Sequence, residues 1–94
     1  MKEKTRVTEE EKQMIFLKFR NTELGLERIR KNLDLNDISE TELVAHCEKI
    51  IEETPHENFE KVGKNYYIMS KKHKAILTIN SFTMAIITAK KIIT

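Results

Sequence analysis

The hydrophobic period of this 94-residue chain changes once, at Pro55. Before Pro55, apolar residues recur every three or four positions, as on one face of an amphipathic helix. After it they alternate with polar residues, and β-branched and aromatic types become common, which is typical of strands. Proline ends a helix because it lacks a backbone donor and clashes with the preceding turn. The sequence therefore predicts one α+β domain with its helices first and its strands last.

Three helices are expected before Pro55, over residues 8–21, 22–33 and 39–53. Thr8 and Glu11 have the spacing of a capping box, which marks the first helix start, and we expect residues 1–7 to be disordered. The second helix contains Gly25, which costs about 1 kcal/mol of helix propensity relative to alanine. We therefore expect a close contact at that position. Cys47 lies on the apolar stripe of the third helix, as a small core residue.

Three strands are expected after Pro55, at Tyr66–Ser70, Ala75–Asn80 and Ala85–Lys90, with Phe59 and Val62 leading into a turn at Gly63. The predicted fold packs the three helices on one face of an antiparallel sheet of three to four strands. The alternation assigns two sets of residues to the two faces. The covered face takes Leu77, Ile79, Ala85, Ile87 and Ala89, and the open face takes Thr78, Asn80, Thr88 and Lys90.

Charge is segregated along the chain. From Lys61 onward there are seven lysines and no Asp or Glu, whereas residues 1–60 hold ten Lys or Arg against fifteen Asp or Glu. The net charge of +2 therefore hides an acidic helical half, residues 8–54, and a basic β-sheet half, residues 58–91. A basic face with no acids among its predicted strands favours a polyanion as partner.

Other features of the sequence narrow the class of protein. A single cysteine rules out an internal disulfide and fits a reducing compartment, and no apolar run approaches a membrane span, so we expect a cytoplasmic protein without a membrane partner. The histidines lack metal-ligand spacing, and we expect neither a metal site nor a cofactor. Phosphate-loop, nucleophile-elbow and HExxH motifs do not occur in the sequence.

Three phrases of the chain, TELGLERIRKNL, ETPHENFEKVGKNYYI and LTINSFTMAIITAKK, resemble the small bacterial family known as domain of unknown function 3781. The resemblance runs from about Asn21 to Lys91, and GKNYYI and TINSFT followed by IITA are its most specific parts. This family implies no particular activity.

The last two strands, with T-I-N, a short turn and I-I-T-A, more distantly resemble the barnase–EndoU–colicin–RelE group. That resemblance implies a metal-independent ribonuclease acting on the open sheet face. Under it the catalytic candidates are His73, Lys90, Thr78 and Thr88. Because the predicted strands hold no acidic residue, a glutamate base of the barnase type is missing, and His73 alone titrates near neutral pH there.

Three functions of different classes stay open. The first is binding of RNA or another single-stranded nucleic acid, the second is cleavage of RNA, and the third is protein interaction, with an acidic partner or a second copy covering the basic sheet. We rank binding above cleavage, because a fold analogy does not establish catalysis. The residues expected to contact nucleic acid are Lys64, Lys71, Lys72, Lys74, Asn80, Ser81, Lys90 and Tyr66, the last either stacking on a base or packing in the core.

Overall fold

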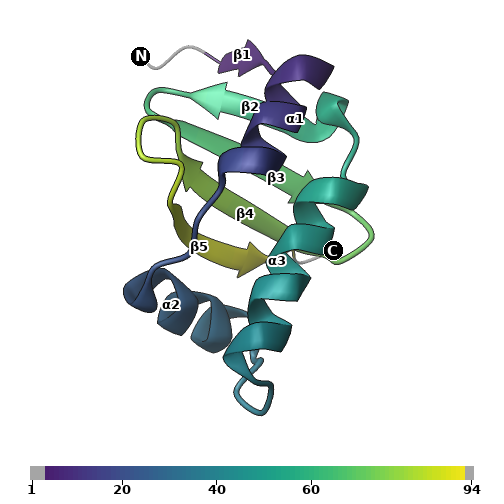
Figure 1. The fold of residues 1–94 in the computed structure, drawn as a ribbon. Helices are drawn as coiled ribbons and strands as arrows, with labels where there is room; N and C mark the ends of the chain where they lie inside the picture. Colours follow the sequence, from purple (N-terminus) through teal and green to yellow (C-terminus); the bar gives the residue numbers. More distant parts are fainter. Residues whose placement is uncertain (1–3, 93–94) are drawn as a thin grey trace.

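The computed structural model describes residues 4–92, and within them three helices precede most of a five-stranded antiparallel sheet (Figure 1). The predicted α+β class and the order of helices before strands are confirmed, but the sheet has five strands rather than three or four. The elements are β1 (Lys4–Arg6), α1 (Glu9–Lys18), α2 (Glu23–Leu33), α3 (Glu40–Glu53), the short 3-10 helix η1 (His56–Asn58), β2 (Phe59–Val62), β3 (Asn65–Ser70), β4 (Ala75–Asn80) and β5 (Ile86–Lys91).

The five strands lie in the order β1-β2-β3-β4-β5, and each pairs antiparallel with the next. The prediction that residues 1–7 are disordered is wrong for residues 4–6, since Lys4 pairs with Val62 and Arg6 with Glu60 in strand β1. Residues 1–3 lie outside the described part of the chain. A three-residue edge strand is too short to show an alternating pattern, so only its pairing with β2 reveals it.

Each helix begins where the sequence predicts, because each start has a capping side chain. Thr8 and Glu11 form the expected capping box at α1. Thr22 accepts a hydrogen bond from the Gly25 amide at α2, and Ser39 accepts one from the Glu42 amide at α3. These side chains satisfy donors that the first turn of a helix leaves unpaired, which fixes the helix ends.

The core lies between the helices and one face of the sheet. Leu77 and Ile79 face it as predicted, and both are fully buried. The prediction for β5 was partly wrong, because a bulge between Thr78 and Ile79 shifts the register so that Ile79 pairs with Ile86. Ile86 is therefore buried in place of Ala85 and Ile87, while Ala89 keeps its predicted position.

The helices cover the sheet unequally. Helix α3 crosses the face of the sheet, whereas α2 lies along β5 (Figure 1). The chain before α2 also joins this edge, since the Arg20 amide donates to the Met84 carbonyl and the Arg20 carbonyl accepts from the Ile86 amide. At the other end of α2, the Asn32 side chain donates to the Ala89 carbonyl at 3.0 Å. These contacts close the β5 edge of the sheet.

Gly25 sits where α2 approaches β5 closely, as its position in the helix suggested. A Cβ atom on residue 25 would lie 2.4 Å from the carbonyl oxygen of Ile86. Since that oxygen belongs to the backbone of β5 and not to a flexible side chain, the clash is relieved only by moving α2 away from β5.

We predict that Gly25→Ala destabilises the protein, although alanine is the better helix former by about 1 kcal/mol. The steric cost exceeds that gain, and we expect a net loss of about 1–3 kcal/mol in the free energy of unfolding, measured by urea denaturation. Glu27→Ala, at an exposed position of the same helix, is the control and should change stability little. A Gly25→Ala protein as stable as the wild type would contradict this packing.

Candidate nucleic-acid interface

Five of the seven C-terminal lysines come together at one end of the sheet, and we call this cluster the basic corner. The β3–β4 turn and the end of β5 meet there, since Lys90 pairs with Ile76, Lys91 pairs with Ala75, and the Ile92 amide donates to the Lys74 carbonyl. All five side chains are exposed: Lys71, Lys72, Lys74, Lys90 and Lys91.

Two carboxylates partly neutralise the basic corner. Glu53, the last residue of α3, lies 3.1 Å from the Lys72 ammonium, and Asp34 pairs with Lys91. Because both ion pairs are exposed, they hold these lysines only weakly in place. Five lysines against two carboxylates leave the basic corner with an excess of positive charge.

The other predicted contact residues lie at the opposite end of the sheet. The Ser81 amide donates to the Lys64 carbonyl at 2.8 Å, which joins the β4–β5 turn to the β2–β3 turn. The side chain of Asn80 accepts from the Phe82 and Thr83 amides and so shapes its own turn. The structure therefore separates Lys64, Asn80 and Ser81 from the predicted lysines of the basic corner.

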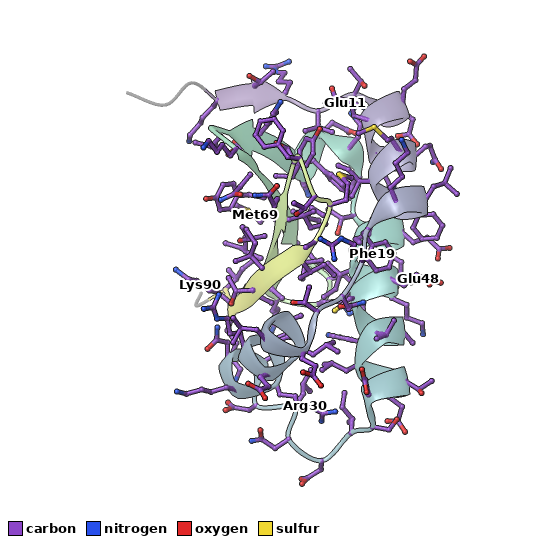
Figure 2. The ribbon with its side chains drawn as sticks, turned by 60° about the vertical axis from the view of Figure 1, so that its left-hand side comes forward. Glu11, Phe19, Arg30, Glu48, Met69 and Lys90 are labelled. Carbon is purple, nitrogen blue, oxygen red and sulfur yellow. The ribbon has the colours of Figure 1, made fainter. Side chains whose placement is uncertain are left out.

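The face of the sheet away from α3 is open, and Met69 and Lys90 project from it (Figure 2). The strand register places residues of all five strands in one row across this face, in the order Arg6, Glu60, Tyr67, Thr78 and Thr88. A second row holds Met69, Ile76 and Lys90, so that Lys90 belongs both to the open face and to the basic corner.

A groove of about 390 Å³ runs over the β2 and β3 side of this open face. Its floor is formed by Val62, Tyr67, Met69 and Ile76, and its polar lining residues are Glu57, Asn58 and Glu60. The expectation of a sheet without acidic residues is wrong, because β2 brings Glu60 into the row beside Tyr67. Glu60 precedes Gly63, whereas the sequence predicts strands only after that glycine, so the local pattern does not place Glu60 in the sheet.

The two tyrosines of β3 face opposite ways. Tyr66 is only 4% exposed, and its hydroxyl lies 3.5 Å from the Glu11 carboxylate under α1. Burial, together with Glu11, raises the pKa of Tyr66. Tyr66 thus packs in the core, and the tyrosine that can stack on a base is Tyr67, which is half-buried in the open face.

Thr78 and Thr88 are direct cross-strand partners, and Lys90 lies two pairs further along, on the same face of the sheet. Their hydroxyls are not freely available, since Thr78 is 9% exposed and the Thr88 hydroxyl accepts from the Asn32 side chain at 3.0 Å. This contact attaches α2 to β5, so the structure gives Thr88 a packing role.

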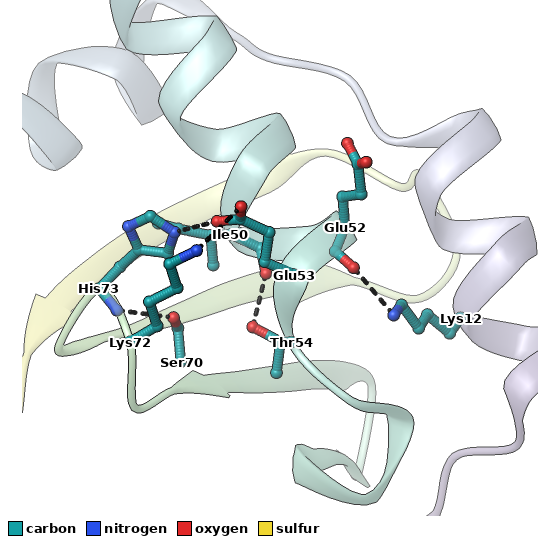
Figure 3. Close-up of polar contacts among 8 residues, drawn as sticks. All are labelled: Lys12, Ile50, Glu52, Glu53, Thr54, Ser70, Lys72 and His73. Atoms are coloured by element: carbon teal, nitrogen blue, oxygen red, sulfur yellow. Dashed lines mark hydrogen bonds and ion pairs between the residues drawn. The ribbon is translucent and has the colours of Figure 1, made fainter.

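His73 lies on the other side of the sheet, against α3 (Figure 3). Its Nε2 is 2.7 Å from the Glu53 carboxylate, and its ring meets His46 edge to face with 5.3 Å between the ring centroids. The structure therefore does not join His73 to Thr78, Thr88 and Lys90. Instead, the fold places His73 beside two residues of α3, Glu53 and His46, which are distant from it in the sequence and were not predicted to be its neighbours.

The histidine pair lines a groove of about 340 Å³ that opens at the basic corner. We call it the histidine groove, and its lining residues are Leu33, Leu35, His46, His73, Lys74, Lys91 and Ile92. Burial lowers the pKa of His46, and the nearby His73 and Lys49 lower it further. The hydrogen bond from His73, followed by that from Lys72, lowers the pKa of the Glu53 carboxyl.

Neighbouring Cys47 does not add a reactive thiol to this groove. Its side chain is fully buried in the core, and burial raises its pKa to about 12.

Within residues 4–92 no cluster of three or more His, Cys, Asp or Glu has a geometry suited to a metal ion. The same part of the chain has no helix long and apolar enough to cross a membrane.

The chain is thus an α+β domain whose five-stranded antiparallel sheet is covered by helices on one face and open on the other. Residues 13–90 match the family described as protein of unknown function (DUF3781), and the chain belongs to that family. The match begins earlier than the resemblance noted in the sequence. Comparisons with curated proteins and with solved structures gave no match, so the resemblance to ribonucleases has no support from them.

The lowered pKa of His46 predicts how stability depends on pH. The unfolded chain protonates His46 at a higher pH than the folded chain does. The stabilising contribution of neutral His46 to the free energy of unfolding is therefore full above about pH 6.5 and is lost as the pH falls below it. We predict that His46→Gln, which cannot take up the proton, loses less stability than the wild type between about pH 7.5 and about pH 5.5. Urea denaturation at the two pH values measures this difference.

His56→Gln is the matched control, since His56 contacts the Val7 carbonyl on another part of the surface. It should retain the pH dependence that His46 confers. An equal loss of stability in His46→Gln and in the wild type would show that His46 is not the group responsible.

Proposed function

We propose that this domain binds single-stranded nucleic acid, RNA first, across the basic corner and the adjoining open face of the sheet. The observation that carries the proposal is the gathering of five lysines at one corner, where they exceed the local carboxylates. Neutralising phosphates with lysines releases counterions, and this supplies much of the affinity of proteins for nucleic acids.

The open face supports a single strand rather than a duplex. Tyr67, Met69 and Ile76 form an apolar floor on which an unpaired base can stack, whereas the bases of a duplex are already stacked on each other. Lys90 connects this floor to the basic corner, so one strand can place phosphates on the lysines and a base in the groove. Glu57 and Glu60 line the groove and can accept hydrogen bonds from amino groups of a base.

We predict that the triple variant Lys71→Gln, Lys74→Gln, Lys90→Gln binds single-stranded RNA much more weakly than the wild type at low salt. The plot of log affinity against log salt should also be less steep by about 2, since each lost phosphate contact on a single strand removes about 0.7 from the slope. Fluorescence anisotropy with a labelled oligonucleotide over a range of salt concentrations gives both quantities.

The control variant is Lys18→Gln, Lys31→Gln, Lys64→Gln, which loses the same charge from exposed positions outside the basic corner. It should keep most of the affinity and of the salt slope. Equal losses in both triple variants would mean that net charge alone attracts RNA, and no binding by the wild type at low salt would overturn the proposed function.

We also predict that Tyr67→Leu weakens binding by about 1–3 kcal/mol, the usual value of one stacked base, while leaving the salt slope unchanged. Phe82→Leu is the control, because Phe82 is 78% exposed in the β4–β5 turn, at the end of the sheet away from the basic corner. Unchanged affinity in Tyr67→Leu would remove the open face from the interface and leave only the basic corner.

A further inference from the structure

The histidine groove holds a pair of acid–base groups that RNA binding by itself does not need. Glu53 bonds His73 through Nε2 at 2.7 Å, and the side chain of His73 is only 17% exposed (Figure 3). A carboxylate in this position orients an imidazole and stabilises its protonated form. Since Glu53 engages Nε2, Nδ1 is the ring nitrogen left for proton exchange with a substrate. The His46 ring lies nearly perpendicular to this ring, in the same groove.

The two histidines lie in different electrostatic surroundings, as a general acid and a general base require. His73 has a carboxylate partner at 2.7 Å, whereas His46 is half-buried and has cationic neighbours, and these surroundings lower the pKa of His46. The charged and titratable groups around the pair come from four parts of the fold: Lys49 and Glu53 on α3, Lys72 and Lys74 in the β3–β4 turn, Lys91 on β5, and Asp34 at the end of α2.

The groove lacks a nucleophile among the described residues. The hydroxyl of nearby Ser70 accepts a hydrogen bond from the backbone amide of His73, not from its ring, and the Cys47 thiol is buried in the core. An acid–base pair of this kind therefore suits a substrate that brings its own nucleophile. RNA does so, because its 2′-hydroxyl lies next to the phosphodiester, and its phosphates are drawn to the same lysines.

We propose that the histidine groove cleaves RNA by internal transfer of the phosphodiester to the 2′-hydroxyl, an inference that rests on the proposed RNA binding. Neutral His46 takes the 2′-hydroxyl proton while the 2′-oxygen forms a bond to phosphorus. The bond from phosphorus to the 5′-oxygen breaks, and protonated His73 gives its proton to that oxygen. Lys74 and Lys91 offset the negative charge of the phosphorane. The products are a 2′,3′-cyclic phosphate and a free 5′-hydroxyl.

The test compares a labelled RNA oligonucleotide with the same sequence made of 2′-deoxynucleotides, incubated with purified wild type, His46→Gln, His73→Gln and the control His56→Gln. Glutamine keeps an amide donor that can still bond Glu53, so His73→Gln tests the chemistry with little change to the fold. We expect cleavage of RNA only, cyclic phosphate ends, a bell-shaped pH profile, and rates at least about 100-fold lower in the first two variants.

Binding to the 2′-deoxy strand, which cannot react by this route, is measured in parallel. Binding without cleavage of RNA overturns the cleavage proposal and leaves the proposed function standing, whereas failure to bind either strand overturns both. Equal cleavage by wild type, His46→Gln and His73→Gln also overturns it. If either variant fails to fold, cleavage of the 2′-deoxy strand or a flat pH profile in the wild type still decides against the proposal.

Discussion

The close approach of α2 to β5 is the contact on which the arrangement of this domain depends. Gly25 allows the helix backbone to lie against the Ile86 carbonyl, and Asn32 attaches the other end of the helix to Ala89. This contact closes the β5 edge of the sheet with helical residues. The face of the sheet away from α3 stays open. It also fixes the end of β5, and with it Lys90 and Lys91, beside the β3–β4 turn.

Folding turns a pattern of charge along the chain into a pattern in space. The basic third of the sequence becomes a meander, in which the turn between β3 and β4 and the end of β5 lie at the same end of the sheet. Lysines distant in sequence therefore gather in the basic corner, while Lys64 lies at the other end. The acidic half supplies Glu53 and Asp34, which pair with two of these lysines and join the helices to the corner.

Most of the fold could be predicted from local patterns, because capping residues and hydrophobic periods are local. The helix starts at Thr8, Thr22 and Ser39 and the three long strands follow from them. Strand β1 and the bulge in β5 could not be predicted, since both depend on pairing with a neighbouring strand. The association of His73 with Glu53 and His46 was hidden for the same reason, because it forms only when α3 packs over the sheet.

If the basic corner and the adjoining open face form one surface for single-stranded RNA, as proposed, both should respond to the same oligonucleotide. The most direct measurement is a titration of the ¹⁵N-labelled protein with a short RNA oligonucleotide, followed by the chemical shifts of the backbone amides. We expect the shifts to concentrate in residues 70–76 and 88–92 and at Tyr67 and Met69. Shifts centred on Lys64 and Ser81 at the other end of the sheet, or none at all, would contradict it.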